Sequence, residues 1–254
     1  MAFDLFLLPF LTGLALAVLL PLLGCYLRLR QQWLAALAYA QMAAAGALTA
    51  AVVALPALLG GLLAASLAGL LRPLSARRLS GMAGDVLLLL AGWAASVLLV
   101  AHWPQAERLG HSLFDGQLYF AGERELGLAL MALLLALLWL YRGHRGLLLA
   151  QLWPDLQRLR GQALWPSQVG FDVLVALCLA VATLGLGVMA VFALAFIPPW
   201  LAFRRQRNWR QALGYAVLLA VLAYGLAFAL ALSLDLPFGP VLALLLVIGA
   251  VFIA

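Results

Sequence analysis

The chain has 254 residues, of which 67% are apolar and only 9% are charged, and its formal net charge is +6. A water-soluble domain is about half apolar and about a quarter charged, so this composition excludes an ordinary soluble globular fold. The apolar residues form Leu- and Ala-rich runs of about 17 to 23 residues rather than alternating ten-residue strands, which predicts membrane-spanning helices and not a β-barrel. We therefore predict an all-α integral membrane protein, a polytopic helical bundle that forms a single transmembrane domain over residues 1–254.

In chain order, the apolar runs predict about nine membrane spans, and about eight to ten spans fit the same pattern. The first run has no basic segment before it, so we interpret it as a retained helix and not as a cleaved leader. Gly185, Gly187 and Pro198-Pro199 interrupt the stretch from 169 to 203, which predicts that one of its two spans is incomplete or irregular. The predicted spans lie near 5–27, 33–54, 56–71, 84–101, 125–141, 169–186, 188–203, 211–233 and 238–254.

The basic residues predict the orientation in the membrane. All 15 of them are arginines, and most lie in four alternate connections, at 28–30, 72–78, 142–160 and 204–210. Because positively charged connections remain in the cytoplasm, this distribution predicts an outer N-terminus and, with nine spans, a cytoplasmic C-terminus. The positive charge is thereby explained by orientation, and we expect no nucleic-acid partner.

Motifs for catalysis and nucleotide hydrolysis are missing from the sequence. The chain has no lysine and hence no Walker A loop, and it has neither a His-Glu-x-x-His nor a Gly-x-Ser-x-Gly motif. His102, His111 and His144 lie in connections or at helix ends, where a solvated histidine is expected rather than a metal ligand. We therefore predict that the chain is not an enzyme and binds no cofactor of its own, and we assign no metal ligand in it.

Few polar groups lie within the predicted spans. Asp85 and Asp172 are expected near the cytoplasmic ends of their helices, where water reaches them, and no charged residue lies near a span centre. A charge at depth is the usual mark of an ion-coupled carrier, so an external energy source is favoured. Cys25 and Cys178 lie in apolar runs, and we expect no disulfide. The hydroxyl and amide groups at depth, expected to pair with neighbouring helices, are Gln41, Thr49, Ser66, Ser96 and Thr183.

The longest connection predicted on the cytoplasmic side runs from about residue 142 to about residue 168. Within it, Pro154 and Asp155 suit the first turn of a helix, because a missing N–H is harmless there and a carboxylate faces the positive end of the helix dipole. Gly161 suits the end of that helix. The pattern predicts a short amphipathic helix at the membrane surface.

This segment resembles the coupling helix in the membrane subunits of ATP-binding-cassette (ABC) importers for zinc, manganese and iron. That family has a Phe-Asp-Pro-Glu-like turn and a short helix that ends in Gly and docks on the ATPase, and here residues 153–161 are Trp-Pro-Asp-Leu-Gln-Arg-Leu-Arg-Gly. The resemblance continues through residues 186–199 and 234–240 and covers nearly the whole chain. It implies that the residues in contact with the ATPase are Trp153, Pro154, Asp155, Leu156, Gln157 and Leu159.

The same resemblance implies an assembly. Two copies are expected to form a pore between them in a bacterial cytoplasmic (inner) membrane, each bound to a cytoplasmic ATPase subunit that uses ATP and Mg. An extracytoplasmic substrate-binding protein is expected to deliver a metal ion. The outer connection, at about 102–124, holds Trp103, Phe114, Tyr119 and Phe120, which suit either contact with that protein or an aromatic belt at the membrane interface.

The second predicted helix departs from the family pattern. Metal importers of this kind carry an Asp-Ala-Leu-Ser-His segment there, which places a carboxylate and an imidazole on one face toward the pathway. Leu37 and Gln41 stand at those two positions, and an acidic residue that the family often has before the fourth helix is replaced near Leu79-Ser80. Zinc or manganese should bind such a pathway poorly. The residues predicted to line it are Leu37, Tyr39, Gln41 and Met42.

Two alternatives to a metal-ion permease follow from this departure. One is a permease for a metal chelate, a siderophore or another small solute, because the side chains around Gln41 offer no ligand set for a hard ion. The other is a membrane scaffold that holds partner proteins and transports nothing. Metal accumulation in cells that lack the gene, and solute flux into vesicles, separate the three cases.

Overall fold

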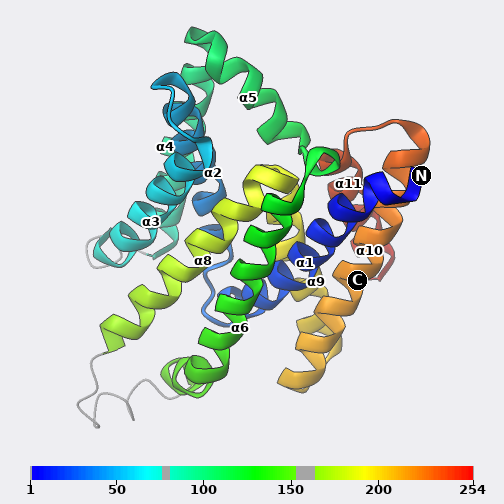
Figure 1. The fold of residues 1–254 in the computed structure, drawn as a ribbon. Helices are drawn as coiled ribbons and strands as arrows, with labels where there is room; N and C mark the ends of the chain where they lie inside the picture. Colours follow the sequence, from blue (N-terminus) through cyan, green and yellow to red (C-terminus); the bar gives the residue numbers. More distant parts are fainter. Residues whose placement is uncertain (1, 76–80, 153–163, 254) are drawn as a thin grey trace.

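The computed structural model describes residues 2–75, 81–152 and 164–253, and Figure 1 shows them as a bundle of long helices. Ten α-helices and one 3-10 turn, η1, make up the described part of the chain. Their bounds are α1 (Ala2–Leu29), α2 (Trp33–Val52), α3 (Ala57–Ser75), α4 (Gly81–His102), α5 (Pro104–Asp115), η1 (Leu118–Phe120), α6 (Glu123–Leu152), α8 (Leu164–Leu186), α9 (Val188–Arg205), α10 (Trp209–Leu234) and α11 (Phe238–Ile253).

Each of the predicted apolar runs forms a helix. Seven helices are long and apolar enough to cross a membrane, and two shorter apolar helices cover Ala57–Arg72 and Phe238–Phe252. Large apolar side chains such as Leu63, Leu98 and Leu134, exposed by 66% or more, point outward from the bundle, where lipid can solvate them. The prediction of a helical membrane protein is confirmed.

Gly187 separates two continuous helices. Its φ of 85° is accessible to glycine, and it ends α8 and starts α9 at a single residue. Pro198 and Pro199 lie inside α9, which continues through them to Arg205. The expectation of an incomplete or irregular span in this stretch is therefore wrong. Membrane helices tolerate prolines because neighbouring helices and local adjustments can satisfy the carbonyl groups that a proline leaves free.

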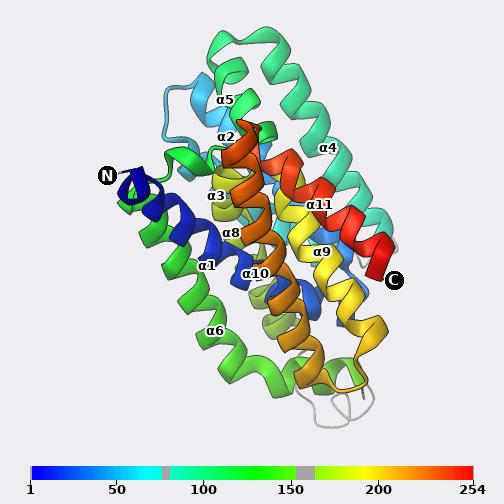
Figure 2. The ribbon, with the colours of Figure 1, turned by 90° about the vertical axis from the view of Figure 1, so that its right-hand side faces the viewer.

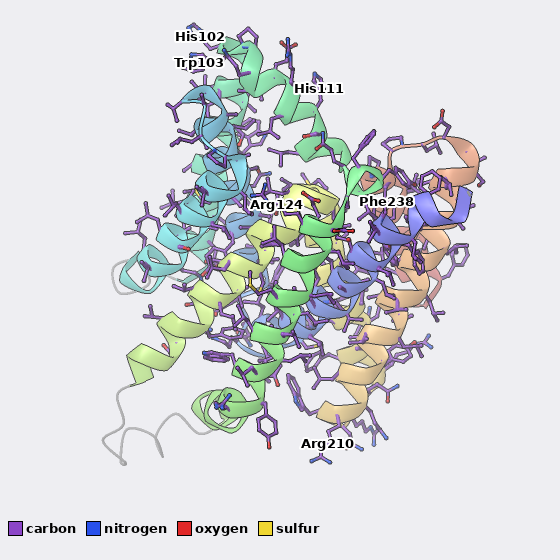
Figure 3. The ribbon with its side chains drawn as sticks, viewed as in Figure 1. His102, Trp103, His111, Arg124, Arg210 and Phe238 are labelled. Atoms are coloured by element: carbon purple, nitrogen blue, oxygen red, sulfur yellow. The ribbon has the colours of Figure 1, made fainter. Side chains whose placement is uncertain are left out.

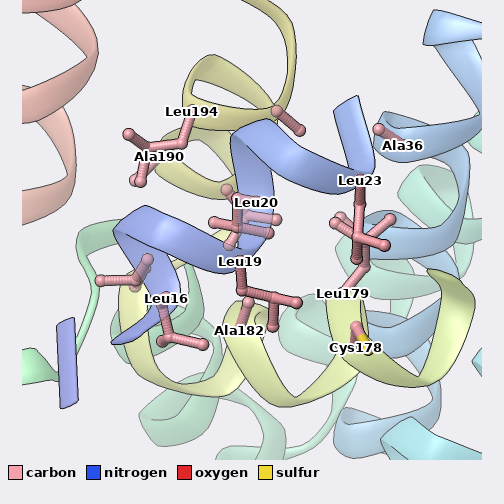
Figure 4. Packing of buried hydrophobic residues seen from close by; sticks show 14 of the residues in the cluster. Leu16, Leu19, Leu20, Leu23, Ala36, Cys178, Leu179, Ala182, Ala190 and Leu194 are labelled. Carbon is pink, nitrogen blue, oxygen red and sulfur yellow. The ribbon is translucent and has the colours of Figure 1, made fainter. Parts of the chain in front are cut away.

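The core forms where leucines of α1 enter surfaces made of small residues. Figure 4 shows Leu19 and Leu23 of α1 facing Cys178, Leu179 and Ala182 of α8, with Ala190 and Leu194 of α9 on another side of α1. Helices in lipid associate by close packing, so alanine and glycine at their contacts bring the backbones together. A Cβ on Gly24 would overlap the Ala195 carbonyl oxygen, which shows how closely α1 approaches α9.

The bundle has two chemically different ends. α5, which the sequence did not predict as a helix, lies across one end, and the α9–α10 connection lies at the other (Figure 1; Figure 2). Figure 3 places Arg210 at the end opposite to His102, Trp103 and His111. We call the end with the connections around Arg30, Arg72 and Arg210 the Arg-rich end.

Candidate functional site

α2, the helix predicted to line the pathway, is the most enclosed of the candidate spans, with 67% of its central residues buried. It contacts α3, α4, α8 and α9 along its sides, and α5 covers its end away from the Arg-rich end. Its small residues make this enclosure possible. A Cβ on Gly46 would overlap the carbonyl oxygen of Gly60, and a Cβ on Gly60 would overlap that of Gly46, so α2 and α3 meet backbone to backbone.

The predicted pathway residues do not converge on one point. Leu37 and Gln41 are four residues apart and share one face of α2, whereas Tyr39 points away from that face. Tyr39 is fully buried and Gln41 is 3% exposed, while Leu37 and Met42 are half-buried. The structure therefore gives α2 two polar groups on different sides.

The oxygen atoms of both polar groups lack a hydrogen-bond partner within the described residues. The hydroxyl oxygen of Tyr39 and the amide oxygen of Gln41 are buried without one. A buried polar atom left unpaired costs about 1–3 kcal/mol, which α2 would avoid with leucine or phenylalanine at these positions. Buried polar groups of this kind make α2 the candidate for a functional helix.

α4 is the helix that encloses Gln41. A Cβ on Gly92 would lie 2.8 Å from the carbonyl carbon of Gln41 and 2.9 Å from the nitrogen of Met42. Only glycine permits this approach, so α4 is in direct contact with the backbone of the predicted pathway. A movement of α4 would change the surroundings of Gln41 directly.

One stripe along α2 is less covered by the neighbouring helices. Leu34 and Met42 are half-buried, and Thr49 is exposed, along one stripe of the helix. The Thr49 hydroxyl donates to the carbonyl oxygen of Ala45 at 2.8 Å. This stripe is the face of α2 that the described helices leave open.

The expectation that hydroxyl groups at depth pair with neighbouring helices is wrong. Each of them donates instead to a carbonyl oxygen of its own helix four residues earlier, because serine and threonine in helices can reach that acceptor without a partner helix. The bonds are Thr49 to Ala45, Ser66 to Leu62, Ser96 to Gly92 and Thr183 to Leu179.

Four charged side chains lie buried together at the Arg-rich end, and we call Arg30, Arg72, Asp85 and Asp172 the charge network. Arg30 follows α1, Arg72 lies in the last turn of α3, Asp85 lies near the start of α4, and Asp172 lies in the first half of α8. Their side chains are exposed by only 9%, 4%, 2% and 2%, respectively. The charge network thus brings together four segments, of which α8 is distant in sequence from the other three.

Arg72 is bonded to both carboxylates. Its Nε donates to Asp85 Oδ1 at 2.5 Å and its Nη2 donates to Asp85 Oδ2 at 3.2 Å, which forms a two-pronged bond. Its Nη1 is 3.3 Å from Asp172 Oδ2, and Arg30 Nη1 donates to Asp172 Oδ1 at 2.9 Å. Two positive and two negative charges compensate each other, which is the condition for burying them.

The burial of Asp85 and Asp172 corrects the expectation that water reaches them. Residue exposure is 2% for Asp85 and 1% for Asp172. Two arginines that the sequence explained by orientation alone turn inward and cover the carboxylates. α3 can come close enough because a Cβ on Gly69 would lie 3.1 Å from the Asp172 carbonyl oxygen. Tyr39 lies within electrostatic range of all four charges.

The remaining predicted residues lie either outside the described part of the chain or away from any cluster of metal-ligating groups. The predicted ATPase-contact residues, from Trp153 to Leu159, and the Leu79-Ser80 position lie outside the described residues. His102 and His111 are exposed, and Cys25 and Cys178 are free and buried. No group of three or more His, Cys, Asp or Glu side chains suited to a metal ion occurs in the part of the chain that the structure describes.

The predicted outer connection contains a helix. α5 is amphipathic, begins with Pro104 at its first turn, and packs on α2 and α4. Trp103 and Phe120 are exposed by 40% and 86%, whereas Tyr119 is half-buried. The Phe114 side chain is outside the described set.

Apolar helices with outward leucines, packed around one enclosed helix, define a polytopic helical membrane protein. The family description that matches, the ABC 3 transport family, covers residues 2–254. The chain belongs to this family and is a membrane permease of an ABC transporter.

Solved structures have the same fold. PsaBC from Streptococcus pneumoniae, in complex with a Fab, is similar with a TM-score of 0.85 at 15% identity, over 99% of this chain and 91% of that one. A protein assigned to the metal-chelate type of ABC transporter, in an inward-facing conformation, is similar with a TM-score of 0.74 at 17% identity, over 96% and 85%. The comparison with curated proteins gives no match.

Proposed function

We propose that this chain is the permease subunit of an ABC importer for metal ions of the zinc, manganese and iron type. The observation that carries the proposal is the family match over residues 2–254, supported by the fold shared with PsaBC over 99% of the chain. The chain has no lysine and so no Walker A loop, so we infer that a separate ATPase subunit drives transport.

Two copies of the chain form the pathway in this proposal. α2 is enclosed by its own chain except along the stripe with Leu34, Met42 and Thr49. A second copy that faces this stripe would close a pathway between the two α2 helices. A substrate-binding protein would deliver the solute at the end covered by α5.

The Arg-rich end faces the cytoplasm in this proposal, in a bacterial cytoplasmic membrane crossed nine times. The arginine distribution supports this orientation. The seven long and two short apolar helices support the number of crossings, since tilting and local thinning of the bilayer accommodate helices of different length. The ATPase would then dock on residues 153–161.

Docking is tested by replacing Trp153, Asp155 and Leu156 together with alanine in the permease and purifying it with its ATPase. We expect the ATPase to be lost from the complex, because the resemblance assigns it to this segment. The matched control replaces a tryptophan, an aspartate and a leucine at the opposite end, namely Trp103, Asp235 and Leu236, which are all exposed. An ATPase that remains bound and stimulated in the first variant contradicts the docking assignment.

A metal chelate is the second candidate substrate, and Leu37 and Gln41 favour it. They stand where the family pattern has a carboxylate and an imidazole, and Gln41 offers only a neutral amide. Cells that lack the gene distinguish the candidates. Lower zinc or manganese content supports the free ion, whereas unchanged content of both metals with lost uptake of a ferric siderophore supports the chelate.

A further inference from the structure

The charge network lies between α8, which follows the predicted ATPase-contact segment in sequence, and helices that pack on α2. α8 begins at Leu164, shortly after residues 153–161, and carries Asp172. We propose that Arg72 and Asp172 are positioning residues that couple movement of the ATPase-contact segment to α2. The inference rests on the proposed importer function and assigns a role to residues outside both the predicted docking segment and the predicted pathway.

The first step of the coupling is α8 itself. It is one continuous helix from Leu164 to Leu186, so a displacement at its start is carried to Asp172 in the first half of the helix. Gly69 of α3 touches the backbone of α8 at Asp172 and Val173. Because this contact is between backbones, α3 and α8 cannot shift against each other without changing the position of the Asp172 carboxylate relative to Arg72.

The second step runs from Asp172 to α2. Arg72 links Asp172 to Asp85 of α4, and α4 touches the Gln41 backbone through Gly92. Tyr39 of α2 also lies within electrostatic range of the charge network. A change in the position of these four charges would therefore affect α2 both at Gln41, through α4, and at Tyr39.

The geometry identifies the contact that can change. Arg30 with Asp172 joins α8 to the α1–α2 turn, and Arg72 with Asp85 joins α3 to α4 through two hydrogen bonds. The single, longer bond of 3.3 Å between Arg72 and Asp172 connects these two pairs. If it breaks, both pairs remain compensated, so this link can open with less cost than either pair could separate.

Stability alone does not explain the four charges. Apolar side chains of similar volume often hold buried helices as well as an ion pair does, or better. Hydrogen-bonded ion pairs, unlike apolar contacts, have distinct arrangements with different partners. An element that couples two sites needs such distinct arrangements. Charges in membrane helices are also rare outside functional sites.

The test uses the assembled importer in vesicles, with the binding protein and Mn²⁺ as the probe, and measures Mn²⁺ taken up per ATP hydrolysed. Asp172→Asn keeps the side-chain shape and removes the charge that Arg72 and Arg30 contact. We expect uptake per ATP to fall about tenfold while the hydrolysis rate stays within about twofold of the wild type, the size of a typical coupling between sites. The matched control is Asp235→Asn, an exposed aspartate at the opposite end, which should leave both values unchanged.

Different outcomes overturn different claims. If Asp172→Asn has the wild-type uptake per ATP, or loses uptake and hydrolysis in proportion, the coupling role is wrong. If the wild-type complex hydrolyses ATP but takes up neither Mn²⁺ nor Zn²⁺, the proposed metal-ion function is wrong, and this inference with it. Should Asp172→Asn fail to assemble, Arg72→Lys keeps the charge but loses the two-pronged bond, and an unchanged ratio in that variant also overturns the coupling role.

Discussion

At the Arg-rich end, the side chains that join α3, α4, α8 and the α1–α2 turn are charged and buried, whereas at the opposite end α1, η1, α10 and α11 meet through aromatic rings. In this aromatic cluster, Phe10, Tyr119, Tyr224, Phe228 and Phe238 have ring centroids between 5.3 and 6.4 Å apart. Burial, with a smaller effect of Asp235, raises the pKa of Tyr119, so its phenol remains neutral.

The two kinds of contact respond differently to movement. Ring contacts rest mainly on dispersion and area, and small shifts of the rings cost little. The hydrogen bonds of the charge network are directional, so helices held by them must exchange partners in order to move. The difference predicts that the Arg-rich end changes between discrete arrangements, and we expect the aromatic end to act as the hinge region.

The largest effect on stability is expected from Arg72→Gln. This change leaves Asp85 without its two-pronged partner and removes one of the two arginines from Asp172, and breaking a buried ion pair in this way costs about 3–5 kcal/mol. Arg210→Gln, the same change at an exposed position of the same end, should stay within about 0.5 kcal/mol. Denaturation of both variants in detergent measures the difference. Equal stability of the two variants would show that the buried charges do not hold the helices of the Arg-rich end together.

A smaller loss is expected where α2 and α3 touch, near the start of α3 and so away from the charge network at the last turn of that helix. In Gly46→Ala the new methyl group overlaps the Gly60 carbonyl oxygen, and such overpacking costs about 1–3 kcal/mol. Gly225 of α10 is the matched control, since a Cβ there has no neighbour within 4 Å. Gly225→Ala should leave stability unchanged or raise it by up to about 1 kcal/mol, because alanine is the better helix former. If both variants lose the same stability, the close approach of α2 and α3 does not explain the loss in Gly46→Ala.

Much of the fold could be predicted from the sequence, because a membrane helix is marked by local composition. All the apolar runs, the outward leucines and the free cysteines follow from hydropathy alone. α5 was missed because it is short and polar, although Pro104 after Trp103 was a signal for a helix start. The helix had no apolar run to reveal it.

The charge network could not be predicted, because its pairs join residues 142, 100 and 13 positions apart. A single sequence gives the charge of Arg72 and Asp172 but not the helix neighbours that bring them together. The same is true of Gln41, whose burial depends on glycine at position 92 of another helix. Predicting the site requires knowledge of the tertiary packing, whereas predicting the helices requires only the local composition.

The smallest effect is expected in the aromatic cluster, from Tyr224→Phe. The Tyr224 hydroxyl donates to the Phe10 carbonyl oxygen at 2.9 Å, and the ring also packs on Phe228 and Phe238. The substitution removes one hydrogen bond and keeps the ring, and hydrogen bonds between membrane helices are worth about 0.6 kcal/mol on average. The exposed Tyr141, changed to phenylalanine, is the control and should show no loss. If Tyr224→Phe lost as much stability as Arg72→Gln, the opposite end would also be held by a directional polar contact, and its role as the hinge would have to be given up.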